Sequence, residues 1–394
     1  MNVNRIYLDN AATTPLDPHV LQQMLPYLTD HYGNPSSIYA TGRDARKAVE
    51  EARRAVANAI NCTAAEIFFT SGGTESDNWA IKGLASANAH KGKHIISTAI
   101  EHHAVLHPLE DLERQGFTVT YVPVDEHGLV SLRDIEKAIQ ADTILIIVIA
   151  ANNEIGTIQP IADIGRIAKE NSIAFHTDAV QAIGAIPVDV RDWRVDTLSL
   201  SAHKFHGPKG VGALYVRKGT RLPAFIQGGA QERNRRAGTE NVPGIVGLGA
   251  AITKAVTKLE ENAKKISALR DDLIQSILKN VPEVRLNGHP TLRLPNNVNF
   301  AVRYVEGEAL LLRLDLLGIA ASSGSACTSG SLDPSHVLLA IGLPHEIAHG
   351  SLRLTLSSLT TQEEIDTVKE ELPLIISNLR AMSPLYEQGE HYVF

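Results

Sequence analysis

The chain has 394 residues, a hydrophobic content of 44% and a formal net charge of −7. This length exceeds what one hydrophobic core usually holds, so we expect a soluble globular protein of two domains. The negative charge argues against nucleic acid as the main ligand, and no apolar run reaches the roughly 18 residues that span a bilayer. The first residues carry no signal-peptide core, and two cysteines, Cys62 and Cys327, exclude a disulfide framework. We therefore expect a cytoplasmic protein with no membrane or nucleic-acid partner.

Strand and helix patterns alternate through the first part of the chain. A short strand and a turn occupy residues 5–15, and an amphipathic helix follows from Arg43 to Ile60. Strands are expected near 66–70, 93–98, 118–122, 143–150, 173–177, 197–201 and 211–216. Helices near 75–89, 104–115, 131–140 and 161–170 fit between several of them. The alternation predicts an α/β fold with a mostly parallel, seven-stranded sheet between helices.

A long helical stretch from Val242 to Asn280, mildly broken near Gly247 and Gly249, leads to the second domain. Helical patterns at 307–317 and 361–379 and strand-like patterns at 297–302 and 351–356 indicate that this domain is a smaller α+β unit. We place the large domain at 16–262 and the small domain at 1–15 with 263–394. Ligands in open parallel sheets bind beyond the carboxyl ends of the strands, and the polar motifs of the large domain fall there.

Lys204 lies in the stretch Ser199–Gly210, between a buried strand and a turn rich in Gly and Pro. A lysine anchored and partly desolvated at such a junction has a lowered pKa, which frees its amine to form a Schiff base with a carbonyl. A solvated loop lysine is the ordinary alternative for this residue alone. The motifs upstream favour the chemical interpretation, because together they describe a socket for a phosphorylated pyridine aldehyde.

The segment Ser71–Ser76 joins a strand to a helix, and its glycines let the backbone approach a ligand closely. The N–H groups of the helix N-terminus would bind a phosphate, with a hydroxyl added by Thr74, although a plain helix cap is also possible. Asp178 follows another strand. A carboxylate buried there needs a partner such as a protonated pyridine nitrogen; a helix N-cap aspartate is the alternative.

Three further polar residues lie close behind predicted strands. Gln181, three residues after Asp178, could hydrogen-bond a ring hydroxyl. His102 could stack on an aromatic ring and move protons near neutral pH, unless it is an ordinary surface histidine. Asn153 closes the most apolar strand, where an amide could contact the ring hydroxyl or a substrate carboxylate.

Cys327 and Arg353 belong to the second domain. Cys327 lies in Ala321–Ser331, a run without large apolar side chains that is typical of a flexible, solvated loop. This surrounding favours a reactive thiol, because structural cysteines are usually buried among apolar residues, as we expect for Cys62 at a helix end. Arg353 interrupts an apolar alternation and either grips a carboxylate with two bonds or is a surface strand arginine.

One motif points to another class of protein. His345–His349 matches the zinc-protease pattern H-E-x-x-H, and His103 and His107 share its spacing. Pro344 and Gly350 leave barely more than one helical turn, and no third ligand is evident. We therefore expect no metal site and regard a zinc hydrolase as unsupported.

In its set of motifs the chain resembles the cysteine desulfurases of the iron–sulfur-assembly and nitrogen-fixation type. These are class V, fold type I enzymes that use pyridoxal 5'-phosphate. The resemblance runs from Tyr7–Thr14 to the C-terminal segment and so covers nearly the whole chain. Its most specific pieces are Ser71–Asn78, Asn152–Gly156, Ser201–Lys204 and Ser322–Cys327.

The resemblance implies a role for each matching residue. Lys204 would bind the aldehyde of the cofactor, and Asp178 would pair with its ring nitrogen. Its phosphate would be bound by four residues: Gly73, Thr74, Ser201 and His203. Gln181 and Asn153 would lie near its ring oxygen, and His102 would stack on its ring face. Thr239 would reach the phosphate of the partner subunit's cofactor, which implies a homodimer. Arg353, with Asn34 and Asn153 nearby, would orient the carboxylate of L-cysteine.

The implied reaction removes sulfur from L-cysteine. Lys204 would take the α-proton, His102 would shuttle a proton, and the Cys327 thiolate would attack the substrate sulfur, leaving a persulfide on Cys327 and releasing L-alanine. The sulfur would pass to an iron–sulfur scaffold or another acceptor protein, on which Cys327 could contact a cluster. The alternatives are a selenocysteine lyase and a non-catalytic scaffold partner in a sulfur-transfer complex. His103 stands where a lysine is common and receives no role.

Overall fold

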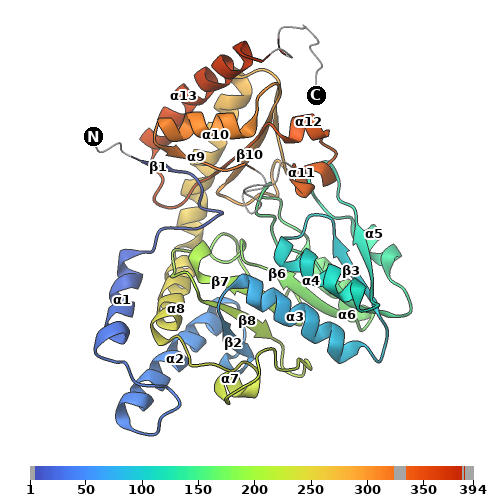
Figure 1. Cartoon of the computed structure of the whole chain (residues 1–394), viewed down its shortest axis with the longest axis vertical. Helices are drawn as coiled ribbons and strands as arrows, with labels where there is room; N and C mark the ends of the chain where they lie inside the picture. The colour runs from blue at the N-terminus through green and yellow to red at the C-terminus, as the bar shows by residue number, and fades with distance from the viewer. Residues whose placement is uncertain (1–4, 324–333, 384–385, 387–394) are drawn as a thin grey trace.

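The computed structural model describes residues 5–323, 334–383 and 386. Figure 1 shows a large body built around a central sheet and a smaller body above it. Two long helices, α8 (Val242–Thr257) and α9 (Leu259–Asn280), connect the two bodies. The predicted α/β fold with a smaller α+β part is confirmed.

The central sheet has seven strands in the order β2-β8-β7-β6-β5-β3-β4. The strands are β2 (Ile67–Thr70), β3 (His94–Thr98), β4 (Thr118–Val122), β5 (Thr143–Ile147), β6 (Ala174–Asp178), β7 (Thr197–Ser201) and β8 (Gly212–Val216). All neighbours are parallel except β8, which is antiparallel to both β2 and β7. The strands lie where the sequence predicts them, although β5 ends before the predicted Ala150.

Helices cover both faces of this sheet because successive apolar side chains along each strand point to opposite faces. Phe68 and Leu145 pack with α3 (Gly73–Asn88) and α4 (His103–Arg114) on one face. Phe69 and Ile146 pack on the other face, in the core shared by α2 (Ala40–Ala59), α6 (Ile161–Glu170) and α8. The short helix α5 (Leu132–Ala138) lies on this second face as well. Burial on both faces explains the near-continuous apolar strands.

Helix α1 (Pro18–Thr29) was not predicted. Its signal is present, since Asp17 caps the helix by accepting a hydrogen bond from the His19 N–H (2.8 Å) and Pro18 occupies the first turn. Val20 and Met24 are buried, and apolar residues at positions 20, 21, 24, 25 and 28 recur at helical spacing, so the sequence carries a second signal for this helix.

The long helical stretch is broken at Lys258, where α8 and α9 meet at an angle of 71°. The predicted break near Gly247 and Gly249 is wrong. Gly249 instead allows α8 to pack tightly on α2, since an added Cβ would lie 2.8 Å from the Cβ of Ala52. Among the described helices none is alone long and apolar enough to cross a membrane, and α8 with α9 reaches that length only across the bend.

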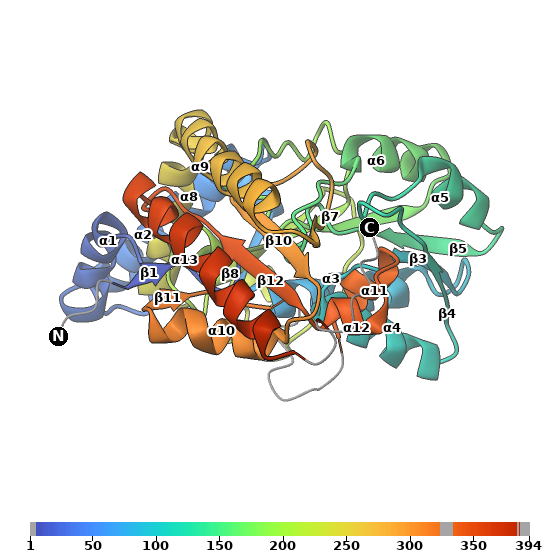
Figure 2. The ribbon, with the colours of Figure 1, turned by 90° about the horizontal axis from the view of Figure 1, so that it is seen from above.

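The small body contains the antiparallel sheet β12-β10-β9 and a pair of short parallel strands from distant parts of the chain. Its strands are β1 (Ile6–Tyr7), β9 (Val284–Leu286), β10 (Asn297–Val302), β11 (Ile319–Ala320) and β12 (Ser351–Thr355). Its other helices are α10 (Gly307–Leu316), α11 (His336–Ala340), α12 (His345–Ala348) and α13 (Gln362–Ala381). Figure 2 shows α13 and α9 side by side over this sheet.

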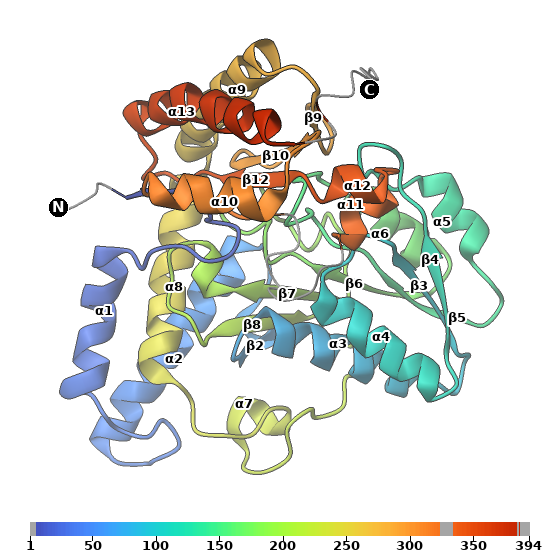
Figure 3. The ribbon, with the colours of Figure 1, turned by 45° about the horizontal axis from the view of Figure 1, so that its top comes forward.

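Each body has its own apolar core. The core of the small body includes Ile6 and Leu8, which β1 brings beside β11. A further cluster, containing Ile100, Ile149 and Leu338, joins the two bodies. Figure 3 shows α11, the helix that carries Leu338, between the small body and the large one. The domain boundaries at 16 and 262 stay a prediction.

Candidate active site

A cavity of about 300 Å³ lies at the carboxyl ends of the central strands; we call it the strand-end cavity. Strands β6 and β7 end at it, and helix α3 begins at it. Its lining includes most of the residues that the sequence motifs single out. They are Gly73, Thr74, His102, Asn153, Asp178, Gln181, Ser201, His203, Lys204 and Arg353.

Lys204 ends a single turn of 3₁₀ helix that follows β7, and its side chain is partly buried. Its Nζ donates hydrogen bonds to the carbonyl oxygens of Ala11 (2.5 Å) and Ala12 (2.9 Å). Thr14 fixes this arrangement, because its N–H and its hydroxyl both donate to the carbonyl oxygen of His203 (2.9 Å each). The N-terminal segment thus holds the lysine amine in the cavity.

Asp178 is the last residue of β6 and is 4% exposed. Its Oδ1 accepts a hydrogen bond from the Val180 N–H (2.8 Å). Burial raises the pKa of Asp178 to about 8, the neighbouring Asp77 acts in the same direction, and Lys204 opposes the shift. Such a carboxylate gains most from a cation placed directly against it, which is what a protonated ring nitrogen supplies.

The N-terminus of α3 forms one wall of the cavity. Gly72 is its N-cap residue, with a φ of 156° that favours glycine, and no side chain caps the helix. Gly73 lets the start of α3 pack closely on Val180, because an added Cβ would lie 2.7 Å from the Val180 side chain. Thr74 and Ser201 add hydroxyls to the lining of the cavity. Uncapped N–H groups beside two hydroxyls are suited to a phosphate.

Two histidines near Lys204 are held in the neutral form. His102 is the N-cap residue of α4, and its Nδ1 accepts a hydrogen bond from the Ala104 N–H (3.0 Å), so its proton is on Nε2. Burial and the charge of Lys204 lower the pKa of His102 to about 4. The same two causes lower the pKa of His203 to about 4. Near pH 7 neither ring adds positive charge to the cavity.

Arg353 reaches the cavity from β12 of the small body and is 3% exposed. Its Nη2 pairs with a carboxylate oxygen of Asp9 (2.9 Å), and its Nη1 donates to the carbonyl oxygen of Asn153 (3.2 Å). Within the described part of the chain its Nε has no partner. A carboxylate ligand could use this Nε, and it would compete with Asp9 for the rest of the guanidinium.

Two predicted residues, Asn34 and Thr239, do not line this cavity and are exposed. Arg46 links the segments that carry them. Its Nε donates to the carbonyl oxygen of Pro35 (3.1 Å), and its Nη1 pairs with Glu240 (3.3 Å). The two residues therefore lie in one surface region, away from the cavity of their own chain.

Cys327 lies outside the described residues. The described residues on either side of it are anchored beside the cavity. Ser322 and Arg353 exchange two backbone hydrogen bonds (3.1 and 2.6 Å), and the Ser335 hydroxyl is 2.5 Å from a carboxylate oxygen of Glu154.

Cys62 fits its predicted structural role. It follows α2, packs against the large core and is partly buried. Burial raises the pKa of its thiol to about 12. The thiol is therefore protonated and a poor nucleophile at neutral pH.

Sequence reasoning missed several residues that shape the site. The carbonyl groups of Ala11 and Ala12 hold Lys204, Asp9 pairs with Arg353, and Thr13 contacts His203 through its hydroxyl (3.1 Å). Asp77 lines the cavity and is 1% exposed. The small residues after β1 predict a turn, but no local pattern connects this turn to Lys204.

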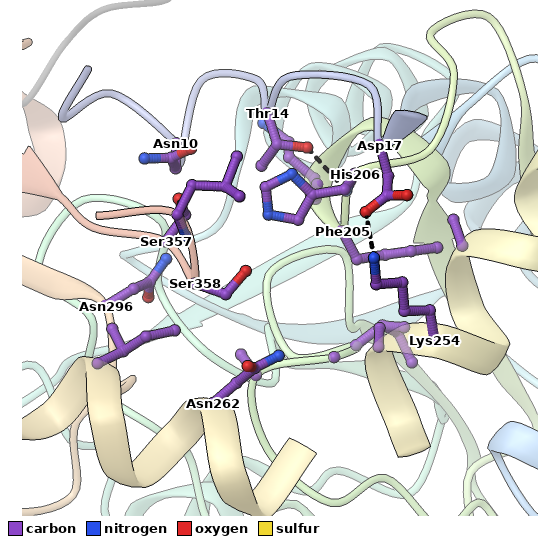
Figure 4. A pocket seen from close by; sticks show the side chains of 18 of the residues that line it. Asn10, Thr14, Asp17, Phe205, His206, Lys254, Asn262, Asn296, Ser357 and Ser358 are labelled. Carbon is purple, nitrogen blue, oxygen red and sulfur yellow. Dashed lines mark hydrogen bonds and ion pairs between the residues drawn. The ribbon is translucent and has the colours of Figure 1, made fainter. Parts of the chain in front are cut away.

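A second cavity, of about 160 Å³, lies between the two bodies and shares Lys204 and Gln181 with the first; we call it the interdomain cavity (Figure 4). Its main charged groups are paired with each other, since Lys254 contacts Asp17 (2.6 Å). His206 is occupied as well, because its Nδ1 is 2.9 Å from the carbonyl oxygen of Pro15.

The histidine pairs that resemble zinc motifs do not assemble a larger ligand set. The rings of His345 and His349 are 4.7 Å apart and those of His103 and His107 are 5.0 Å apart. Helix α12, which carries the first pair, has four residues. In the residues that the structure describes, no three His, Cys, Asp or Glu side chains lie together in a way that could hold a metal.

Comparisons with known proteins agree on one family. The model of the family "Aminotransferase class-V" matches residues 6–368. A protein named cysteine desulfurase IscS from Methanosarcina thermophila is 60% identical over 380 residues, which cover 96% of this chain and 94% of that protein. A solved NifS-like protein is 41% identical with a TM-score of 0.90, covering 95% of this chain and 100% of the other. The structure titled SspA in complex with cysteine is 38% identical with a TM-score of 0.79, covering 90% and 100%. The chain therefore belongs to the class V aminotransferase family and, within it, to the cysteine desulfurases.

Proposed function

We propose that this chain is a pyridoxal-phosphate-dependent cysteine desulfurase. It would remove sulfur from L-cysteine, release L-alanine and keep the sulfur as a persulfide on Cys327. The observation that carries this proposal is the strand-end cavity, in which Lys204, Asp178 and the uncapped N-terminus of α3 meet. The 60% identity to a named cysteine desulfurase over 96% of the chain supports the choice of reaction.

The residues of the cavity fit pyridoxal 5'-phosphate group by group. Lys204 would bind its aldehyde carbon, and Asp178 would pair with its ring nitrogen. The first turn of α3, with Thr74 and Ser201, would hold its phosphate. When bound there, the cofactor supplies an electron sink that stabilises negative charge on the substrate's α-carbon. Gln181 and Asn153 would lie near the ring oxygen, and His102 would lie on the ring face.

The side chains of the protein would bind the substrate and move its protons. Arg353 would orient the substrate carboxylate from the small body. The Lys204 Nζ would remove the α-proton and later return a proton. His102 would donate from Nε2, because its Nδ1 is occupied by the Ala104 N–H. This hydrogen bond supports donation of a proton more than its acceptance, so we refine the predicted shuttle to a donor at Nε2.

Sulfur transfer would follow by nucleophilic attack. The Cys327 thiolate attacks the Sγ of the substrate, a new S–S bond forms, and the bond between Cβ and Sγ breaks. Its electron pair stays with the carbon fragment, which takes up protons and leaves as L-alanine. The persulfide on Cys327 then passes its outer sulfur to an iron–sulfur scaffold or another acceptor protein. We propose that this takes place in the cytoplasm.

A homodimer is also proposed. Helix α1 and the segment after it expose several large apolar side chains, which in water favour burial against another surface. These side chains are Leu21, Leu25, Leu28, Tyr32, Ile38 and Tyr39. Asn34 belongs to this surface and Thr239 lies near it, so either residue could reach the cavity of a second copy. Light scattering during size-exclusion chromatography tests this proposal: a monomer at micromolar concentration would contradict it.

The first experiment is intact mass spectrometry of the purified protein after L-cysteine is added without reductant. We expect one added sulfur, mapped to the peptide of Cys327 and absent from a Cys327→Ala variant. Cys62→Ala is the matched control and should keep the added sulfur. If the mass does not change although the cofactor is bound at Lys204, the proposed substrate is wrong, and L-selenocysteine is tested next.

A further inference from the structure

A row of buried polar side chains, formed by Asp77, His176, Asp178 and Thr197, lies under α3 and behind the strand-end cavity. His176 and Asp178 share one face of β6 because side chains alternate along a strand, and Thr197 of β7 is the register partner of His176. The Nε2 of His176 is 3.1 Å from Oδ1 of Asp77, and its Nδ1 is 2.9 Å from the hydroxyl of Thr197. None of these four side chains belongs to a residue more than 4% exposed.

This region holds more carboxyl groups than cations. Asp77 on α3, Asp178 on β6 and Glu101 after β3 are all buried. The charge of Asp77 raises the pKa of Asp178, and both aspartates raise the pKa of Glu101. Lys204 is the cation that faces Asp178, and His176 is the imidazole that lies between Asp77 and Thr197. Two ionised carboxylates side by side in a dry site are costly, so the group must retain protons near neutral pH.

The hydrogen bonds of His176 allow it to share a proton with Asp77 without any movement of heavy atoms. In one state the Nε2–H of His176 donates to an ionised Asp77, and the Thr197 hydroxyl donates to Nδ1. In the other state a protonated Asp77 donates to Nε2, and the Nδ1–H donates to Thr197. A hydroxyl is both donor and acceptor, so each state leaves every group bonded, and the two states differ by one proton.

We propose that Asp77 and His176 hold this proton as a pair, so that Asp178 is the one ionised carboxylate available to the ring nitrogen of the cofactor. This inference rests on the proposed function. It makes Asp77 and His176 positioning residues: they act through Asp178 and not on the substrate. Burial raises the pKa of Asp77 to about 7 and of Asp178 to about 8, while burial lowers the pKa of His176 to about 4. A cation at the ring nitrogen would favour the ionised form of Asp178, which leaves the retained proton to the Asp77 carboxyl near neutral pH.

The test is the affinity of cofactor-free protein for pyridoxal 5'-phosphate at pH 6.5 and pH 8.5, followed by absorbance. The amide of a His176→Gln variant can donate to Asp77, which favours the ionised carboxylate, so Asp77 should lose its proton at a lower pH than in the wild type. We expect about tenfold weaker binding at pH 6.5 and a difference below about twofold at pH 8.5, where Asp77 is ionised in both proteins, one pKa unit of interaction being tenfold. Inorganic phosphate, which does not reach Asp178, should bind equally to both proteins.

The double variant Asp77→Asn/His176→Gln distinguishes charge from structure. Removing the second carboxylate should restore cofactor affinity at pH 6.5 to within about twofold of the wild type. If the double variant binds as weakly as His176→Gln, or if His176→Gln matches the wild type at both pH values, the proposal is overturned. Thr197→Ser keeps the hydroxyl and is the matched control.

A folding defect in His176→Gln would not end the test. Asp77→Asn is nearly isosteric, and it should remove the part of the pH dependence of cofactor binding that is centred near pH 7; an unchanged dependence refutes the pair. A failure of the proposed function gives a different result. In that case pyridoxal 5'-phosphate would cause no absorbance change in the wild-type protein that is lost in a Lys204 variant.

Discussion

The two cavities beside Lys204 differ in how their titratable side chains are buried and paired. The strand-end cavity contains Asp178, whose nearest described hydrogen-bond donor is a backbone N–H, and a lysine whose amine is held by carbonyl oxygens. In the interdomain cavity the lysine and the aspartate contact each other at 2.6 Å, and the side chain of Lys254 is 52% exposed. The first cavity keeps a carboxyl group buried with a raised pKa, whereas the second contains an ion pair whose lysine is half exposed.

This difference indicates where chemistry takes place. A carboxyl group whose pKa burial raises to about 8 resists ionisation, so its presence is explained best by a ligand cation that stabilises its charged form. A partly exposed ion pair contributes little to stability and needs no ligand. Segment 10–14 lines both cavities, and the carbonyl oxygens of its Ala11 and Ala12 hold the Lys204 amine.

The comparison is tested most strongly by removing each lysine in turn. Lys204→Ala should lower kcat for alanine release from L-cysteine by at least about 10³-fold, because the group that binds the cofactor and moves the α-proton is lost. Lys254→Ala should stay within about twofold of the wild type. Equal losses of kcat in the two variants would show that catalysis does not depend on the strand-end cavity more than on the interdomain cavity.

The next largest effect is expected at the buried carboxyl group of Asp178. Asp178→Asn keeps the size of the side chain but removes its charge, so it should lower kcat by about 10²-fold and weaken cofactor binding. Steady-state rates and a titration with pyridoxal 5'-phosphate measure both quantities. A variant with normal rate and normal cofactor affinity would contradict the pairing of Asp178 with the ring nitrogen.

Arg353 tests whether the small body contributes to the same cavity. Arg353→Met removes the guanidinium, and we expect KM for L-cysteine to rise about 10- to 100-fold, as expected for a charged hydrogen bond. Arg353 also pairs with Asp9, so the rise must be compared with Asp9→Asn, which spares the guanidinium. A rise confined to Asp9→Asn would assign Arg353 to structure instead of substrate binding.

The cofactor-free protein should lose stability as the pH rises from about 6.5 to about 8. Burial raises the pKa of Asp77, Asp178 and Glu101 above their values in the unfolded chain, so their contribution to stability is lost progressively as the pH rises from about 4 to about 8. Burial lowers the pKa of His102 and His176 to about 4, so their contribution is lost as the pH falls from about 6.5 to about 4 and opposes the carboxyl groups only in that acidic range. Thermal unfolding across pH 5 to 9 at constant ionic strength checks this. A midpoint that rises steadily to pH 9 would contradict it.

The smallest effect is expected in the interdomain cavity. Asp17→Asn removes the ion pair with Lys254 but keeps an N-cap for α1. The free energy of unfolding should fall by no more than about 1 kcal/mol, and activity should be unchanged. Denaturant titration measures the first quantity. A loss of activity larger than that of Asp178→Asn would contradict the comparison of the two cavities.

Strands and their order along the chain follow from local pattern. The apolar runs that end at Thr70, Asp178 and Ser201 are recognisable because strands buried on both faces carry few polar residues. Helix α1 escaped prediction although its cap and its apolar residues at 20, 21, 24, 25 and 28 are both local signals. The break at Lys258 escaped because neither Gly nor Pro marks it.

The sequence by itself determined which kinds of residue would be available for chemistry: a lysine, an aspartate and a glycine-rich helix start, each behind a strand. Those features are local, because strand endings and helix starts depend on neighbours a few residues away. Tertiary structure alone decided that Lys204 would bond to Ala11 and Ala12, 193 and 192 positions earlier, and that Asp77 would meet His176, 99 positions later. Such contacts depend on how the sheet, α3 and the N-terminal segment pack together, and no local pattern carries that information.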